Sequence, residues 1–234
     1  MFMLYEATLT KNPIITFALV SNRTSMSGYL QTFLLPVVSY NILYFGPVYF
    51  QACFGSSAIC SGVLSLPLVT TLEPCLMLTG ISITATKQYR PQLWLGWALY
   101  LAGMGGMLTL AVDTPFAHIA GFLVLQGVGS SMIYATTYFP ILALLPIMEN
   151  AHALVFFAFC RSFAPWLPIC FVGEFPGGVS IAYSVIPVIG TLPELLRIEV
   201  RITFADSLDV LWHVCIGITG AGLLVSLLMG FNTL

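Results

Sequence analysis

Long apolar stretches, separated by short islands of charge, are the feature that most constrains how this chain folds. Most of the charged residues gather in three islands, at 6–23, 87–90 and 174–209. Only 7% of the 234 residues are charged, whereas about a quarter are charged in a typical water-soluble domain. Water cannot solvate a surface so poor in charge. The chain is therefore predicted to fold in a lipid bilayer.

The lengths of the apolar stretches indicate the architecture. An α-helix needs about 20 apolar residues to cross a hydrocarbon core roughly 30 Å thick. Closed β-barrels also satisfy the backbone in lipid, but their strands alternate in polarity, and the continuous apolar runs here do not. The predicted fold class is all-α, a polytopic membrane bundle of about six transmembrane helices. The spans are expected at 28–53, 62–85, 93–111, 117–138, 151–172 and 210–229.

The chain is predicted to form one membrane domain, 28–230, after an N-terminal cytosolic flank, 1–27. A loop at 174–209 is expected between the last two spans. Apolar and polar residues alternate within 195–204, a strand-like period that predicts an extended or interfacial segment. Asp206 is a residue type that caps helix N-termini, which suits the entry to the last span.

Basic residues in short loops predict the orientation of the chain in the membrane. Lys11 and Arg23 precede the first span, and Lys87 and Arg90 lie between the second and third. The N-terminus and this loop are therefore predicted to be cytosolic. The first ten residues, with Glu6 as their only charge, do not match a cleaved secretory signal.

Two charged residues lie within predicted spans, where a charge is costly and commonly functional. Glu73 is either a proton-coupling or cation-binding carboxylate, or a buried acid hydrogen-bonded to the neighbouring Thr70 and Thr71, or a substitution tolerated under weak constraint. Arg161 either faces a cavity and binds an anionic group, or reaches the interface or a structural partner.

Other polar residues in the spans complete the candidates for a substrate pathway. They are Tyr44 and Gln51 in the first span and Gln126 and Tyr134 in the fourth. The alternatives are structural, because aromatic residues at span ends form interface belts and a glutamine within a span bonds a neighbouring helix.

Small residues within the spans predict close helix contacts, with hinge motion as the alternative. The cysteines are predicted to pack between helices as small apolar residues; the alternative is a disulfide between Cys53 and Cys60, the one pair that flanks a single loop. The glycines concerned are Gly103, Gly105, Gly106, Gly127, Gly129, Gly217, Gly220 and Gly222.

The sequence carries no catalytic motif. His118, His152 and His213 lie in different segments without metal-ligand spacing. Phosphate-binding loops and nucleophile elbows are also missing, and no basic stripe suits nucleic acid. We therefore expect no enzymatic activity, no cofactor, no metal site and no nucleic-acid partner, and we expect the lipid bilayer as a partner.

A series of short motifs resembles a known family in order and spacing from about residue 12 to 229. The chain resembles the C-terminal half of a fungal major facilitator superfamily transporter, of the fourteen-span multidrug and toxin efflux type that exchanges drugs for protons. The motifs are SNRTS at 21–25, GYLQTF at 28–33, PVYFQ at 47–51, SGV at 61–63, LPL at 66–68, KQYRP at 87–91, LGW at 95–97, QGVG at 126–129, FCRSF at 159–163 and FADSL at 204–208, with Trp212.

The resemblance implies a six-helix bundle that rocks against another about a central cavity. It implies a small-molecule substrate, a second six-helix bundle or a homodimer as partner, and the plasma or vacuolar membrane as location. Lys87, Tyr89 and Arg90 match the family's cytosolic loop, although a Gly-rich basic turn is more usual there. The alternative is a membrane protein that binds or regulates a full-length relative without transport, or a fragment without activity.

Overall fold

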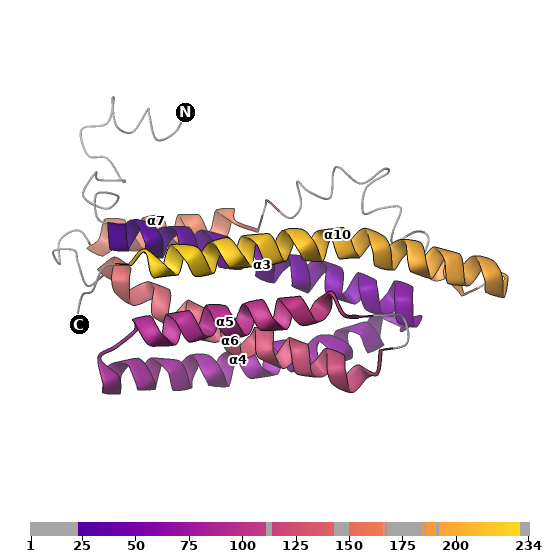
Figure 1. The fold of residues 1–234 in the computed structure, drawn as a ribbon, viewed down its shortest axis with the longest axis horizontal. Helices are drawn as coiled ribbons and strands as arrows, with labels where there is room; N and C mark the ends of the chain where they lie inside the picture. Colours follow the sequence, from indigo (N-terminus) through magenta and orange to yellow (C-terminus); the bar gives the residue numbers. More distant parts are fainter. Residues whose placement is uncertain are drawn as a thin grey trace, which may run out of the picture.

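The computed structural model describes residues 23–110, 114–142, 150–165, 167, 184, 186–190 and 192–229. These residues form a bundle of helices and contain no strand, which confirms the all-α prediction (Figure 1). The long helices are α3 (Arg23–Phe54), α4 (Ala58–Thr86), α5 (Arg90–Met107), α6 (Phe116–Leu142), α7 (Asn150–Phe163) and α10 (Glu194–Leu227).

Each of the six predicted spans coincides with one of these helices, although the boundaries differ. Four of them, α3, α4, α6 and α10, are long and apolar enough to cross a bilayer. The helix α5 has 18 residues and α7 has 14 in the described part of the chain. The predicted flank is shortened, because 23–27 already belong to α3, and the rest of it lies outside the described residues.

The prediction of a loop as far as residue 209 is wrong. The helix α10 begins at Glu194, directly after Pro193, and continues without a break into the last span. In the first half of α10, the residues that face the bundle recur every three or four positions, which is the period of a helix. Leu195, Ile198 and Ile202 lie between them and are exposed. The inward positions are Arg197, Arg201, Phe204, Leu208, Leu211 and Cys215.

Local signals fix the ends of α4 and α5. The side chain of Ser57 accepts a hydrogen bond from the backbone N–H of Cys60 and caps α4. Lys87 ends α4 in the left-handed conformation, at φ 56°, and its N–H donates to the carbonyl of Ile83. This conformation favours glycine, so Lys87 occupies a turn of the kind that the family resemblance associates with glycine. Cys53 and Cys60 are both free thiols, so the alternative of a disulfide between them is not realised.

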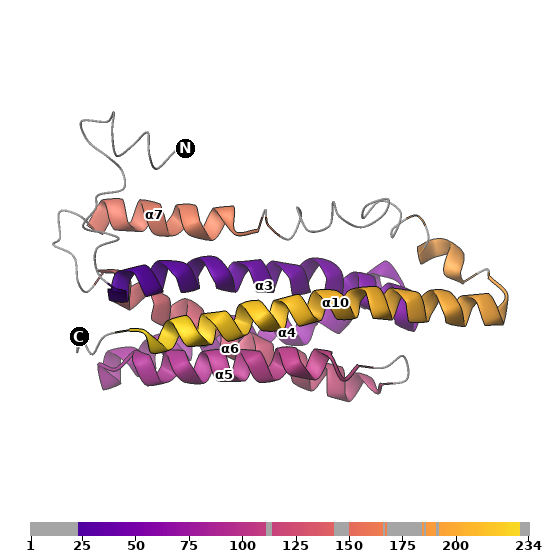
Figure 2. The same ribbon diagram turned by 45° about the horizontal axis from the view of Figure 1, so that its top comes forward.

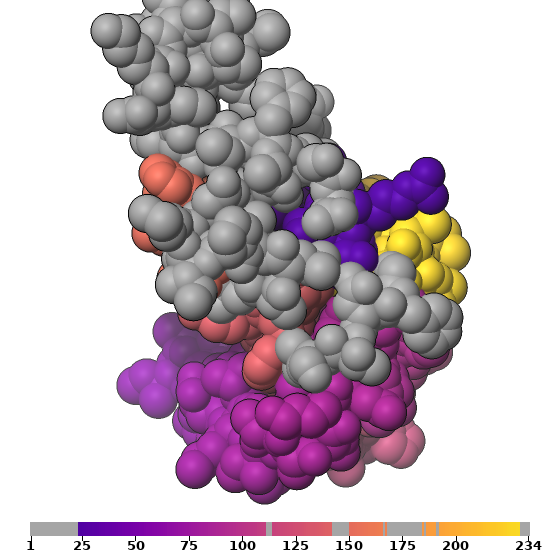
Figure 3. Space-filling view, turned by 90° about the vertical axis from the view of Figure 1, so that its left-hand side faces the viewer, coloured from indigo at the N-terminus to yellow at the C-terminus, as the bar shows by residue number. Residues whose placement is uncertain are grey.

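At one end of the bundle, where Lys87 follows α4, Arg90 lies beside residues 225–229 at the end of α10. Ser27 donates to a carbonyl of this turn at 2.7 Å and Trp94 to another at 3.2 Å, and Arg90 donates to a third. These side chains add hydrogen bonds to carbonyls at the C-terminal end of α10, where the helix runs out of its own N–H donors. Figure 3 views this end, with the start of α3 in indigo beside the yellow end of α10. We call it the basic end; that it is cytosolic stays a prediction.

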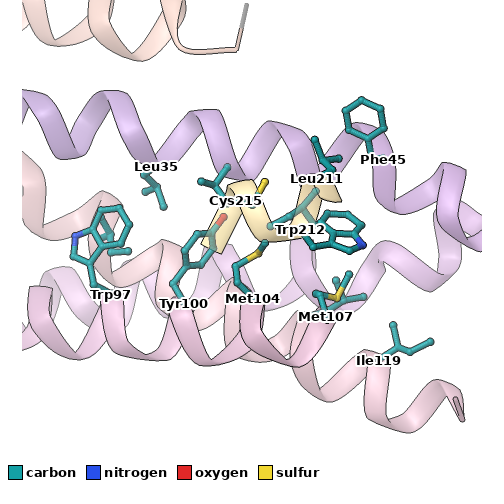
Figure 4. Packing of buried hydrophobic residues seen from close by; sticks show 14 of the residues in the cluster. Leu35, Phe45, Trp97, Tyr100, Met104, Met107, Ile119, Leu211, Trp212 and Cys215 are labelled. Atoms are coloured by element: carbon teal, nitrogen blue, oxygen red, sulfur yellow. The ribbon is translucent and has the colours of Figure 1, made fainter. Parts of the chain in front are cut away.

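The main hydrophobic core lies between α5 and the pair formed by α3 and α10. Trp97, Tyr100, Met104 and Met107 form a row along α5 and are nearly inaccessible to solvent (Figure 4). The helix α7 lies on the opposite side of α3 from α5 (Figure 2). It packs through a separate cluster of Tyr29, Ile141, Ala153, Phe156 and Phe157.

The helices α5 and α6 approach each other through glycines. A Cβ added to Gly129 would lie 2.6 Å from the backbone nitrogen of Tyr100 and 2.8 Å from the carbonyl oxygen of Gly96. Such contacts confirm the glycine prediction at five positions, and at three others nothing lies within 4 Å. The five are Gly103, Gly106, Gly127, Gly129 and Gly222, and the three are Gly105, Gly217 and Gly220.

Gly129→Ala is expected to lower the free energy of unfolding by about 1–3 kcal/mol, because the new methyl group meets backbone that cannot rotate away. Gly121→Ala, on the same helix, is the control, since nothing lies within 4 Å of its Cβ. Reversible unfolding in mixed detergent micelles measures both. Equal stabilities for the two variants would contradict a backbone contact at Gly129.

Candidate functional site

Arg161 and Tyr134, two residues predicted for the substrate pathway, lie together. The guanidinium carbon of Arg161, on α7, is 4.5 Å from the ring centroid of Tyr134, on α6. This distance is within the range of a cation–π interaction. Arg161 is exposed while Tyr134 is partly buried against the core, so the cation lies at the edge of the bundle.

An aromatic contact one helical turn away repeats this pairing. Tyr138 follows Tyr134 by four residues on α6, and Phe157 precedes Arg161 by four on α7. Their ring centroids are 5.7 Å apart and the rings meet edge to face. The two contacts therefore lie one helical turn apart along the antiparallel helices α6 and α7. In the contact with Tyr134, the guanidinium of Arg161 occupies the place that an aromatic ring takes in the other.

A group of hydroxyls on α3 and α5 adjoins Tyr134. The hydroxyls of Ser39 and Tyr100 are hydrogen-bonded at 3.1 Å, and Ser39 and Tyr40 lie near the hydroxyl of Tyr134. Tyr40 also stacks on Tyr44, with centroids 6.2 Å apart. We call these residues the tyrosine cluster: Ser39, Tyr40, Tyr44, Tyr100, Tyr134 and Arg161.

Of the cluster, sequence reasoning identified Tyr44, Tyr134 and Arg161 and missed the remaining three. Ser39 and Tyr40 could have been recognised from the polar run 39–41 in the middle of an apolar span.

The two candidate glutamines are not part of the cluster. The amide of Gln51 donates to the hydroxyl of Ser61 at 3.0 Å and so bonds α3 to α4, which is the structural alternative. Gln126 is completely buried against Gly103 of α5, and neither polar atom of its amide has a partner among the described residues.

Glu73 lies on the outer face of α4 and is exposed. The hydroxyls of Thr70 and Thr71 donate to the carbonyls of Leu66 and Pro67 rather than to this carboxylate. The interpretation of Glu73 as a buried acid held by threonine hydroxyls is therefore wrong.

Of the three loop residues, Tyr89 and Arg90 pack against the basic end, whereas Lys87 is exposed. Tyr89 and Arg90 are buried, and the guanidinium of Arg90 stacks on Trp94 at 5.2 Å from the ring centroid. Burial raises the pKa of Tyr89 above its ordinary value, although the adjacent Arg90 opposes this shift.

The tyrosine cluster therefore offers aromatic surfaces, hydroxyls and one cation, which suits non-covalent binding of a planar organic molecule. No group of three or more His, Cys, Asp or Glu side chains suited to a metal ion occurs among the described residues.

Comparison with known proteins identifies the family. No family model matches the chain. The MFS-type efflux pump MMF1 of Pseudozyma antarctica is 34% identical over 159 residues, 68% of this chain and 29% of that protein. The efflux pump FUS6 of Gibberella fujikuroi is 34% identical over 163 residues, 69% of this chain and 29% of the pump. MFS transporter L2 of a Phoma species is 25% identical over 246 residues, 97% of this chain and 41% of that transporter. The chain belongs to the major facilitator superfamily (MFS).

This MFS member is an integral membrane protein, as its superfamily and its four helices of bilayer-spanning length both show. The chain spans between 29% and 41% of the length of these relatives. The family resemblance drawn from the short motifs is thereby confirmed.

A double-mutant cycle on Arg161→Gln and Tyr134→Leu should show a coupling of about 0.5–2 kcal/mol in the free energy of unfolding, because the two side chains are in direct cation–π contact. The control cycle pairs Arg161→Gln with Tyr44→Leu, since Tyr44 stacks on Tyr40 and should not couple to Arg161. Reversible unfolding in mixed micelles supplies the energies. Additive effects in the first cycle would show that the contact is energetically neutral.

Proposed function

We propose that this MFS chain is the C-terminal six-helix bundle of a proton-coupled carrier that exports small organic molecules, and that it works against a second six-helix bundle. The relatives named as efflux pumps support export, and the plasma or vacuolar membrane is where such export removes a compound from the cytosol. The need for a second bundle is inferred from the exposed outer face of α4.

Along the whole of α4, a line of residues recurs alternately every four and three positions, which is the spacing of a helix-packing seam. Only Ser61, Thr79 and Ile83 of this helix are buried, and none of them belongs to the line. Gly80 in the line has nothing within 4 Å of its Cβ position. We call the line the α4 seam: Ile59, Val63, Leu66, Thr70, Glu73, Met77, Gly80 and Thr84.

Lipid is a poor environment for this seam because Glu73 lies in its middle. An acidic side chain at the centre of a bilayer costs about 3 kcal/mol even on the mildest scales. A symmetric contact between two copies of α4 would bring two carboxylates together, which is also unfavourable. A different helix bundle that offers hydrogen-bond donors to Glu73 fits better, and we assign Glu73 as the group that exchanges protons during transport.

We further propose that the substrate lies against the tyrosine cluster. The cluster joins α3, α5, α6 and α7 and includes the exposed ring of Tyr44 and the exposed guanidinium of Arg161. It is thus built into helices, and Tyr44 and Arg161 leave it accessible from outside the bundle.

Flux measurements test the proposal. The chain is reconstituted in liposomes with a pH gradient, alone and with the part of FUS6 that it does not match supplied as a second polypeptide. We expect no flux of organic dyes from the chain alone and gradient-driven flux from the pair.

Glu73→Gln should abolish the gradient-driven component and leave downhill exchange, whereas Glu199→Gln, on the exposed face of α10, should change neither. Flux by the chain alone would overturn the need for a partner, and binding of FUS6 segments without flux would favour the regulatory alternative.

Crosslinking tests the position of the partner. A benzophenone attached at Met77→Cys in the α4 seam should crosslink to the second bundle, in a background that lacks the six native cysteines. Leu224→Cys on α10 is the control, because the two side chains are similarly exposed, at 71% and 64%, and Leu224 should reach only lipid. Adducts of two copies of this chain would identify a homodimer instead.

A further inference from the structure

Among the described residues, the helices around Arg161 offer it no counter-charge. The sequences of α3, α5, α6 and α7 contain no Asp or Glu. The two ion pairs among the described residues, Arg197–Glu194 and His213–Asp209, both lie on α10. Arg161 therefore carries a positive charge that no described carboxylate neutralises, although a membrane protein normally pairs such a charge.

Glu73, the remaining acid outside α10 in the described ranges, does not serve as this partner. It lies on the outward seam of α4, whereas α7 packs against α3 and, less extensively, α6.

The contact with Tyr134 positions the guanidinium without consuming its hydrogen-bonding capacity. The guanidinium carbon of Arg161 lies over the ring of Tyr134, 4.5 Å from its centroid, and the five N–H donors of a guanidinium point outward in its own plane. No hydrogen bond from Arg161 to a described residue competes for these donors. A planar guanidinium binds a carboxylate through two parallel N–H···O bonds, which a lysine ammonium cannot do.

The geometry points to an anion site: Arg161, held on the ring of Tyr134, binds the acidic group of an aromatic organic anion, such as a carboxylate, while the rings of Tyr40 and Tyr44 pack against its aromatic part. This inference rests on the proposed function and specifies the class of substrate that the tyrosine cluster takes. An organic cation is disfavoured, because the nearby helices offer it no carboxylate and Arg161 repels it.

Equilibrium dialysis of the full chain in zwitterionic lipid nanodiscs tests the inference, with empty nanodiscs as the baseline for partition into lipid. The probes are 1-naphthoate, the neutral 1-naphthamide and the cationic 1-naphthylmethylammonium, which share one ring system. We expect naphthoate to bind at least about tenfold more tightly than naphthamide, as a charge-assisted hydrogen bond implies, and the cation to bind most weakly.

Arg161→Gln should reduce the ratio of the two affinities to within about twofold, while Arg161→Lys, which keeps the charge but not the planar fork, should retain part of the preference. Arg197→Gln, which removes the same charge from α10, should leave the ratio unchanged. Circular dichroism checks that each variant is folded.

Equal affinities for naphthoate and naphthamide in the unmodified chain, or a preference that survives Arg161→Gln, would overturn the anion site and leave the aromatic site intact. If none of the three probes bound above empty nanodiscs, both the anion site and the substrate site of the proposed function would be wrong.

Discussion

The backbone contact between α5 and α6 sets the spacing on which the rest of the bundle depends. In lipid there is no hydrophobic drive between helices, so association relies on close packing and on hydrogen bonds. Gly96 and Gly129 let the two backbones meet. With α6 fixed against one side of α5, the large residues Trp97 and Tyr100 point toward α3 and α10 and build the core there. Gly222 of α10 in turn accommodates the ring of Trp97.

Hydrogen bonds between side chains also join α5 to α3 and fix the position of one helix along the other, which apolar packing alone would not do. The indole N–H of Trp97 on α5 donates to the amide oxygen of Gln31 on α3 at 2.8 Å, and within α3 Gln31 is oriented by a bond that it donates to the hydroxyl of Ser27 at 2.9 Å. Such bonds contribute about 0.6–2 kcal/mol each in membrane bundles. The hydrogen bond between Ser39 and Tyr100 is of the same kind, so part of the tyrosine cluster also joins α3 to α5.

Hydropathy predicted the helices because crossing a bilayer demands length and apolarity, and both can be counted in a sequence. It did not predict the start of α10, because the alternation around Arg197, Glu199 and Arg201 has the period of a strand, whereas the helix turns the two arginines inward and Glu199 outward. Hydropathy also does not show which face of a helix contacts its neighbours. Gly217 was therefore expected in a helix contact, but nothing lies within 4 Å of its Cβ position. The contacting face of a helix depends on the helices that pack against it, which the sequence of that helix alone does not identify.

The separate packing of α7 bears on how the site works. Near the basic end, Tyr29 of α3 contacts Phe156, with ring centroids 4.7 Å apart, and its hydroxyl donates to the carbonyl of Ala153. Arg161 lies one to two turns beyond these contacts, outside the main core, and its described contact is the ring of Tyr134. A ligand held between Arg161 and the tyrosines of α3 would therefore link α7 to the body of the bundle, so occupancy of the site and the position of α7 are energetically coupled.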